Sequence, residues 1–317
     1  MRMKTILKPR TLGLFWGLLL LCSPVRADPI KPHFPTDVTM NKDAGRGNWL
    51  IVKLRSESGE ELPFMVDTGC PRTILDKSLE TQLGKRLGSM TIWTLGGKQE
   101  TFIYAVPKFY WGSTQVMTGS SILVCDLKKM IAHAGEPIKG ILGMDCLKNY
   151  CIQLDFEAGK MSFLDPNCAK TAELGKAFPL EFSEDGEDAD TGIQPFIQRA
   201  GLLGGTCTNS IIDTGSNIDG DAERSVIKRH ASGSYSGGFV QHVKHFLAIE
   251  GVVNRAVELP ACVWEGNTYT NLIIGKAPSD SPSWIGLRFL ARHLVTFDFP
   301  NGMMYLKQTS IGPILGK

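Results

Sequence analysis

The tripeptide Asp-Thr-Gly occurs twice in this chain, at residues 67–69 and 213–215, each time directly after an apolar run. A glycine within a second apolar segment follows each copy at nearly the same distance. Gly143 lies 76 residues beyond Asp67, and Gly286 lies 73 residues beyond Asp213. Two copies with the same sequel are rare by chance at ordinary amino-acid abundances. The chain is therefore constrained to fold as two copies of one module.

The same order of expected elements surrounds each copy. A β-hairpin precedes each aspartate, over residues 49–66 and 195–212, and a second hairpin covers 150–164 and 293–306. Alternating apolar residues around a glycine turn are typical of such hairpins. Self-similarity at an offset of about 143 residues indicates a duplicated, β-rich module.

These motifs resemble the aspartic peptidases, and in particular the retropepsin-like modules of bacterial proteins, here duplicated in one chain. The resemblance covers about residues 46–166 and 176–308. It implies an all-β fold of two pepsin-like or retropepsin-like β-barrel lobes with an interlobe active-site cleft. Members of the family share a catalytic Asp-Thr-Gly loop, a glycine-bearing hairpin flap and an apolar-apolar-Gly segment beside the catalytic loop.

The length of 317 residues allows two domains, each able to bury its own core. We expect a signal peptide at 1–27, a Pro-rich linker at 28–45, an N-terminal lobe at 46–166, a linker at 167–177, a C-terminal lobe at 178–308 and a tail at 309–317.

The first 27 residues combine a basic start, a short apolar stretch and a small-residue cleavage site, which predicts a secretory signal peptide and a secreted or periplasmic protein. The alternative is an uncleaved anchor, which is the one expected route to a membrane. Cleavage removes five of 34 basic residues and no acidic ones, so 29 bases face 32 acids. No long basic run is present, which argues against a nucleic-acid partner.

Asp67 and Asp213 are the expected catalytic pair. Two carboxylates that share one proton can take a proton from water and support the substrate carbonyl at the same time. The sequence therefore predicts an aspartic endopeptidase that acts on a peptide or protein substrate, with no cofactor and no metal. Neighbouring glycines would let the two loops approach, and neighbouring hydroxyls would brace them. These supporting residues are Thr68, Gly69, Thr214, Gly215 and Ser216.

The two catalytic loops differ at the residue that follows the tripeptide, which is Cys70 in the first and Ser216 in the second. If Ser216 bonds to the Asp213 carboxylate, Asp213 should ionise more readily than Asp67. Oxidation or alkylation of Cys70 would add bulk beside the reacting water and reduce activity. The change from Leu-Gly-Met-Asp in the first half to Ile-Gly-Leu-Arg in the second is expected to affect the fold little.

Two hairpins with mobile, glycine-bearing tips are expected to act as flaps over an extended peptide. The flap candidates are Trp93, Gly96, Gly97, Tyr235, Gly237 and Gly238.

Seven cysteines follow residue 27, and we expect Cys207 and Cys262 to pair while most others are small buried residues. The acidic run at 181–190 lacks a full calcium loop, and His242 and His245 lack metal-ligand spacing.

Two alternatives stay open from the sequence. One is a catalytically inactive peptide-binding protein of the same fold. The other assigns activity to homodimers of each module, but duplication within one chain makes a monomer with an intramolecular pair the simpler expectation.

Overall fold

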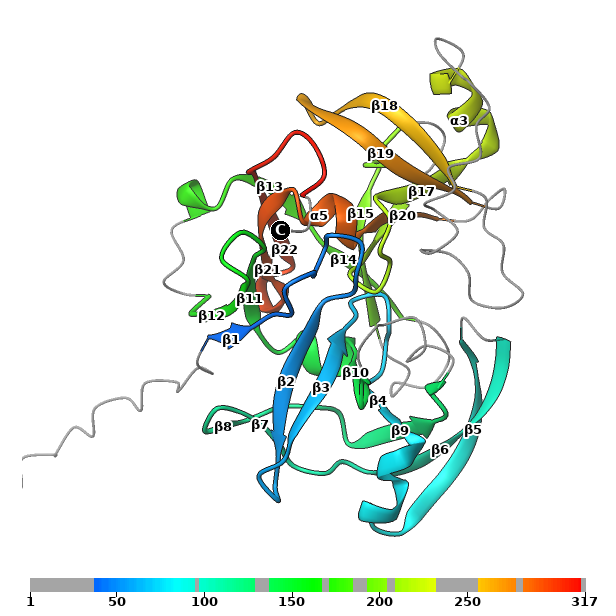
Figure 1. The fold of residues 1–317 in the computed structure, drawn as a ribbon, viewed down its shortest axis with the longest axis vertical. Coiled ribbons are helices and arrows are strands. Elements are labelled where there is room, and N and C mark those ends of the chain that lie inside the picture. Colours follow the sequence, from blue (N-terminus) through cyan, green and yellow to red (C-terminus); the bar gives the residue numbers. More distant parts are fainter. Residues whose placement is uncertain are drawn as a thin grey trace, which may run out of the picture. The chain divides into compact units, whose positions relative to one another are not determined.

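The computed structural model describes residues 37–94, 97–128, 137–166, 171–184, 193–203, 209–231, 256–277 and 282–314, which all belong to one compact unit. These residues form three β-sheets with a few short helices, which confirms the expected all-β class (Figure 1). No helix among them is long and apolar enough to cross a membrane.

The first half of the chain forms a nine-stranded sheet in the order β5-β6-β9-β4-β10-β3-β2-β7-β8. Its strands are β2 (Ile51–Ser56), β3 (Glu61–Val66), β4 (Ile74–Asp76), β5 (Arg86–Thr94), β6 (Gly97–Ala105), β7 (Phe109–Trp111), β8 (Thr114–Gln115), β9 (Ser121–Cys125) and β10 (Gly140–Leu142). Two short helices, η1 (Lys77–Gln82) and α2 (Met144–Leu147), accompany this sheet.

The second half forms a seven-stranded sheet in the order β14-β15-β16-β20-β17-β19-β18. Its elements are β14 (Glu181–Glu184), β15 (Ile193–Gln198), β16 (Asn209–Asp213), β17 (Gly220–Glu223), α3 (Arg224–Ala231), β18 (Val257–Trp264), β19 (Asn267–Ala277), β20 (Ser283–Gly286) and α5 (Leu287–Leu290).

The two sheets repeat one topology. β3 pairs with β10 in parallel, as β16 does with β20, and an antiparallel partner, β4 or β17, follows. Next come a parallel strand, β9 or β19, and an antiparallel one, β6 or β18. The duplication inferred from the sequence is thus visible in strand order and strand direction.

A six-stranded sheet contains strands of both halves, in the order β1-β12-β11-β21-β22-β13. Its elements are β1 (Val38–Thr39), β11 (Cys151–Asp155), β12 (Lys160–Leu164), β13 (Lys176–Pro179), β21 (His293–Asp298) and β22 (Met303–Gln308), with η2 (Thr171–Glu173) and η4 (Phe299–Asn301) nearby. β11 and β21 pair antiparallel at its centre, which joins the two expected hairpins (Figure 1). Parts of the segments assigned to linkers, in β1 and β13, also belong to this sheet.

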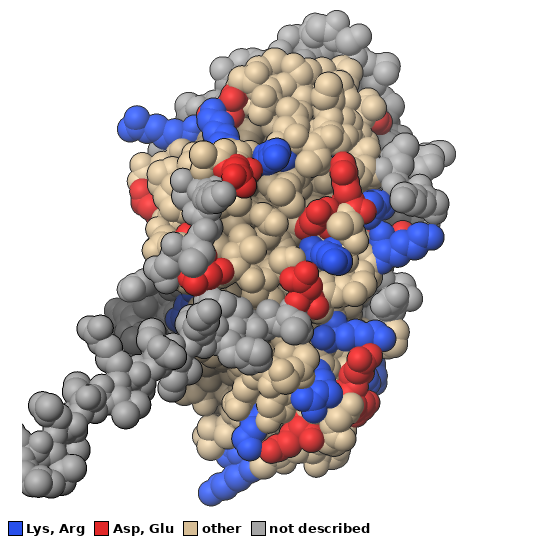
Figure 2. Space-filling view, turned by 90° about the vertical axis from the view of Figure 1, so that its left-hand side faces the viewer, with Lys and Arg blue, Asp and Glu red and all other residues tan. Residues whose placement is uncertain are grey.

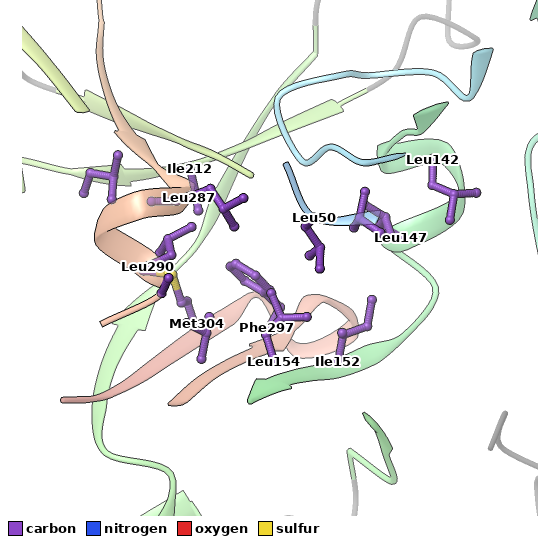
Figure 3. Close-up of a cluster of buried hydrophobic side chains, with 14 of the residues drawn as sticks. Leu50, Leu142, Leu147, Ile152, Leu154, Ile212, Leu287, Leu290, Phe297 and Met304 are labelled. Atoms are coloured by element: carbon purple, nitrogen blue, oxygen red, sulfur yellow. The ribbon is translucent and has the colours of Figure 1, made fainter. Parts of the chain in front are cut away.

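The largest hydrophobic core is shared by the two halves, whereas we expected each half to bury its own. Leu50, Leu142 and Ile152 of the first half lie in one buried cluster with Ile212, Leu287 and Phe297 of the second (Figure 3). The β11–β21 pairing explains this, because it places the apolar faces of both hairpins on one continuous sheet. A smaller cluster, which includes Met65 and Ile141, belongs to the first half alone.

Phe297→Ala should therefore destabilise both halves together. Phe297 is 1% exposed, and removing a buried aromatic ring typically costs about 3–5 kcal/mol. Urea unfolding followed by tryptophan fluorescence and circular dichroism should show one transition shifted to lower urea by both probes. Val263→Ala is the control, because that side chain is 70% exposed and its loss should change stability by about 0.5 kcal/mol or less. Two separate transitions in the variant would contradict a shared core.

Candidate active site

Each of the two aspartates lies at the end of a buried strand that has a parallel partner. The backbone N–H of Asp67, just after β3, donates to the Leu142 carbonyl at 3.0 Å. Asp213, the last residue of β16, is in register with Gly286 of β20. Ile212 is fully buried in the core, so alternation along the strand directs Asp213 to the opposite face. The fold thus delivers one carboxyl group from each half to the same place.

Reciprocal hydrogen bonds between Thr68 and Thr214 hold the two loops together. The Thr68 hydroxyl donates to the Ile212 carbonyl at 2.6 Å and accepts the Thr214 N–H at 3.0 Å. The Thr214 hydroxyl donates to the Val66 carbonyl at 2.8 Å and accepts the Thr68 N–H at 3.0 Å. Both threonines are buried, so these four bonds satisfy groups that water cannot reach.

Gly69 and Gly215 lie against the carboxyl group of the opposite half. A Cβ atom on Gly69 would stand 2.5 Å from Asp213 Oδ1, and one on Gly215 would collide with the Asp67 carboxyl group. Only glycine leaves room for this approach, which gives the third position of each tripeptide a steric reason.

The carboxyl groups of Asp67 and Asp213 are hydrogen-bonded to each other. Burial raises the pKa of both, and the charge of Asp67 raises the pKa of Asp213 further. Asp213 is 4% exposed and Asp67 is half-buried. Asp67 Oδ1 also accepts the N–H groups of Gly69 at 2.8 Å and Cys70 at 3.1 Å, which favour its ionised form. Asp213 Oδ1 likewise accepts the Gly215 N–H at 2.7 Å, so backbone bonds favour ionisation of both groups. The Asp67 charge raises the pKa of Asp213, which favours Asp213 as the holder of the shared proton.

This order is the reverse of the one expected from Ser216. Ser216 lowers the pKa of Asp213 only through its backbone N–H, and this effect is smaller than that of burial and of the neighbouring Asp67 charge. The sequence argument was wrong because it considered one hydroxyl and left out the charge of the neighbouring Asp67.

Cys70 is poorly suited to the reactive role considered from the sequence. Its thiol donates to the Arg72 carbonyl at 3.1 Å. Burial and the Asp67 charge raise the pKa of Cys70 well above its usual value, so little thiolate forms near neutral pH.

The segments that contain Gly143 and Gly286 run beside the two Asp-Thr-Gly loops. The Met144 N–H donates to the Cys70 carbonyl at 2.9 Å, and the Leu287 N–H donates to the Ser216 carbonyl at 2.7 Å. A Cβ atom on Gly143 would stand 2.8 Å from the Cys70 carbonyl oxygen. The short helices α2 and α5 begin directly after these glycines, so their first N–H groups fix the two loops.

Arg288 of the second half stands where the first half has Asp145, and it forms a buried ion pair that the sequence argument missed. In the first half, Asp145 Oδ1 accepts the Thr73 N–H at 2.8 Å and the Thr73 hydroxyl at 2.6 Å. In the second half, Asp219 takes the place of Thr73, and its carboxylate pairs with Arg288 and with Arg292, the latter at 2.7 Å. The acidic residue of this contact therefore follows the glycine of the second apolar segment in the first half and the Asp-Thr-Gly loop in the second half. The signal in the sequence is that Thr73 and Asp219 both lie six residues after the catalytic candidate.

Gln194 of β15 was also missed. Its side-chain amide donates a hydrogen bond to the Gly69 carbonyl, which adds a contact from the second half to the first catalytic loop. No motif marks this residue in the sequence.

The first expected flap is present as the β5–β6 hairpin, in which Thr94 pairs with Gly97 across the turn. Trp93 belongs to β5. Gly96 and the second flap's candidates, Tyr235, Gly237 and Gly238, lie outside the described residues.

The expected pairing of Cys207 with Cys262 is not found, because Cys262 is a buried free thiol. Cys262 lies on β18 opposite the fully buried Tyr269 of β19, and its side chain packs in the hydrophobic core. Cys207 lies outside the described residues.

Comparison with known proteins finds similarity to an aspartyl protease family in the first half and to pepsin-like proteins in the fold. Residues 52–146 match the family model described as "Aspartyl protease". A comparison with curated proteins finds no match. Among solved structures, the aspartic proteinase from Irpex lacteus is similar at a TM-score of 0.53 and 15% identity, covering 88% of this chain and 98% of that one. Basic 7S globulin from soybean is similar at a TM-score of 0.53 and 13% identity, covering 88% and 96%.

These findings confirm the resemblance to aspartic peptidases and the two-lobed, pepsin-like fold. The two solved structures bear on the fold alone, since their sequence identities are low.

Removing either threonine hydroxyl should weaken the junction between the halves. Thr68→Val and Thr214→Val each leave a buried N–H and a buried carbonyl without a partner, which should cost about 1–3 kcal/mol in urea unfolding. Thr68→Ser is the control, because it keeps the hydroxyl. The double valine variant should lose less than the sum of the single ones, since loss of either pair of bonds already loosens the loop contact that the other pair holds. Equal stability of Thr68→Val and Thr68→Ser would refute this role.

Asp213→Asn should make the folded state more stable than the wild type at neutral pH. The folded-state pKa of Asp213 is raised, so its contribution is fully present below the unfolded pKa and is lost as the pH rises through the folded one. Asparagine cannot ionise and avoids that loss. Urea unfolding between about pH 3 and pH 8 should show the variant's advantage growing with pH. A constant difference across that range would contradict a buried, protonated Asp213.

Proposed function

We propose that this chain is an aspartic endopeptidase, which hydrolyses peptide bonds with a water molecule activated between Asp67 and Asp213. The observation that carries the proposal is the pair of hydrogen-bonded carboxyl groups, one from each half, in a setting that raises the pKa of both. The family match over residues 52–146 and the pepsin-like fold support it.

The unequal surroundings of the two carboxyl groups assign their roles. Asp67 is half-buried and is the more exposed of the two, so it is the ionised member and takes a proton from the water. Asp213 is buried and holds the shared proton, which it directs to the carbonyl oxygen of the scissile peptide bond. The roles then reverse, and a proton reaches the leaving nitrogen. Two close carboxyl groups that share one proton are the known arrangement in aspartic proteases.

The β5–β6 hairpin supports a substrate in extended form. A hairpin that closes over a cleft excludes water, and an extended peptide can form backbone hydrogen bonds with it. Binding then depends on backbone bonds for affinity and on side-chain contacts for selectivity.

The remaining parts of the proposal are a monomer that acts in a secreted or periplasmic location and binds no nucleic acid. The presence of both carboxyl groups in one chain supports the monomer. Basic and acidic side chains are interspersed on the face shown in Figure 2, which gives little support to a nucleic-acid partner.

Asp67→Asn and Asp213→Asn should each abolish peptide hydrolysis without unfolding the protein. Each replacement removes one half of a mechanism that needs both a proton acceptor and a proton donor. The measurement is digestion of a peptide library at several pH values, with product masses determined by mass spectrometry. The wild-type rate should be bell-shaped in pH, limited on the acid side by protonation of Asp67 and on the alkaline side by ionisation of Asp213.

A transition-state mimic with a hydroxyl group between the two carboxyl groups should inhibit the reaction. Full activity in either asparagine variant, or inhibition by chelators or serine reagents alone, would point to other chemistry. Binding of peptides without hydrolysis at any pH would favour the inactive peptide-binding protein of the same fold.

A further inference from the structure

Arg72 follows the first catalytic loop and has a rigidly held backbone. Its carbonyl accepts the Cys70 thiol at 3.1 Å, and the Cys70 N–H in turn bonds to the Asp67 carboxyl group at 3.1 Å. On its other side, a Cβ atom on Gly143 would stand 2.6 Å from the Arg72 carbonyl oxygen. The base of this side chain is therefore fixed close to the proposed reacting carboxyl groups.

Among the described residues, the Arg72 guanidinium has only neutral partners at contact distance. Its Nη2 donates to the Ser121 hydroxyl at 2.6 Å, and its Nη1 lies 3.9 Å from the Met90 sulfur. None of the ion pairs between described residues includes Arg72, although the side chain is half-buried. Arg86 and Arg292, by contrast, each pair with a carboxylate. A guanidinium offers five N–H donors in a planar fork that fits a carboxylate, so Arg72 retains unused donors.

Asp145 is attracted by this guanidinium, but its carboxylate already has hydrogen-bond partners. Its Oδ1 accepts two hydrogen bonds from Thr73. Arg72 acts on Asp145 only through longer-range attraction, which is the weakest influence on the pKa of that carboxyl group. The guanidinium is thus a partly desolvated cation without a close counter-ion, a state that an arriving anion would relieve.

The guanidinium contacts the β5–β6 hairpin through Met90. Met90 is on β5, and it packs with Ile92 and Cys70 against the smaller apolar cluster, the one that contains Met65 and Ile141. Arg72 therefore stands between the catalytic loop and the strand that leads to the tip of the hairpin. An extended peptide advances about 3.3 Å per residue, so we expect a side chain a few positions from the cleaved bond to approach Arg72.

We propose that Arg72 binds a carboxylate of the peptide substrate, so that the enzyme selects peptides with Asp or Glu near the cleaved bond. This inference rests on the proposed peptidase function, and it adds a substrate class to it. The carboxylate would form a charge-assisted, two-pronged contact with the guanidinium, and the hairpin above would limit access of water to that contact.

The test compares matched peptides. A library digest by the wild type first identifies the position at which Asp and Glu are enriched. Paired peptides with Glu or Gln at that position are then mixed, and the ratio of their kcat/KM values is measured by competition, which does not depend on the amount of folded enzyme. We expect the wild type to favour Glu about tenfold or more, with the preference fading below about pH 4 as the substrate carboxylate is protonated. Peptides with free and amidated C-termini show whether the chain end supplies the carboxylate instead.

The variants separate recognition from a structural role. Arg72→Met should bring the ratio close to one, and Arg72→Glu should reverse it in favour of a Lys peptide. Arg86→Met is the matched control, because Arg86 lies on the same hairpin but already pairs with Glu80, and its ratio should equal that of the wild type. Equal loss of both peptides in Arg72→Met, with the ratio retained, would show that Arg72 only braces β5 and β9.

Failure of the inference can be told from failure of the proposed function. Cleavage of Glu and Gln peptides at equal rates by the wild type would overturn the role of Arg72 and leave the peptidase intact. If neither peptide is cleaved at any pH, the peptidase proposal fails, and fluorescence anisotropy of labelled peptides then tests Arg72. Tighter binding of the Glu peptide that is lost in Arg72→Met would still support carboxylate recognition, and equal binding would refute it.

Discussion

The reciprocal bonding of Thr68 and Thr214 is the interaction on which the rest of the site depends. Each hydroxyl accepts an N–H from the opposite loop and donates to a carbonyl of the opposite strand, so neither loop is satisfied alone. This crossing fixes the distance between the halves at the point where both carboxyl groups emerge. The need for Gly69 and Gly215 follows, since at that distance a Cβ atom would overlap the facing carboxyl group. The shared proton follows as well, because carboxyl groups held this close in a buried setting cannot both ionise cheaply.

Around that crossing the two halves keep the same framework and differ in charge. The contact that fixes the threading segment is Thr73 with Asp145 in the first half and Asp219 with Arg288 in the second. Arg292, which is fully buried, joins Asp219 and also donates to the Ile311 carbonyl at 3.1 Å, so the second contact extends to the end of the chain. The second half therefore has a buried ionic network at the position where the first half has a hydrogen bond from the Thr73 hydroxyl. Removing one member of such a network costs more than the network contributes, because it leaves a buried charge alone.

The sequence was sufficient for the features that depend on local pattern. The hairpins before each aspartate and the second hairpin of each half lie where alternation and glycine turns indicated. It was insufficient where the outcome depends on which segments meet. The shared core arises from the pairing of β11 with β21, which no local pattern encodes. The order of the two pKa values depends on the burial of the pair and on the charge that Asp67 places beside Asp213. The free thiol of Cys262 depends on which face of β18 points inward.

The pairing of β11 with β21 is nearly symmetric, with Gln153 and Thr296 opposite each other near its middle and joined by a hydrogen bond of 3.0 Å. Two identical chains could pair in the same way, but their two loops would be copies, and either carboxyl group could hold the proton with equal probability. Covalent fusion removes that degeneracy. Each loop can acquire its own neighbours, so the identity of the base and of the acid becomes a heritable property of position in the chain, and recognition residues such as Arg72 can act on one side of the substrate only. The fused protein can therefore distinguish the two directions in which an extended peptide could lie across the site.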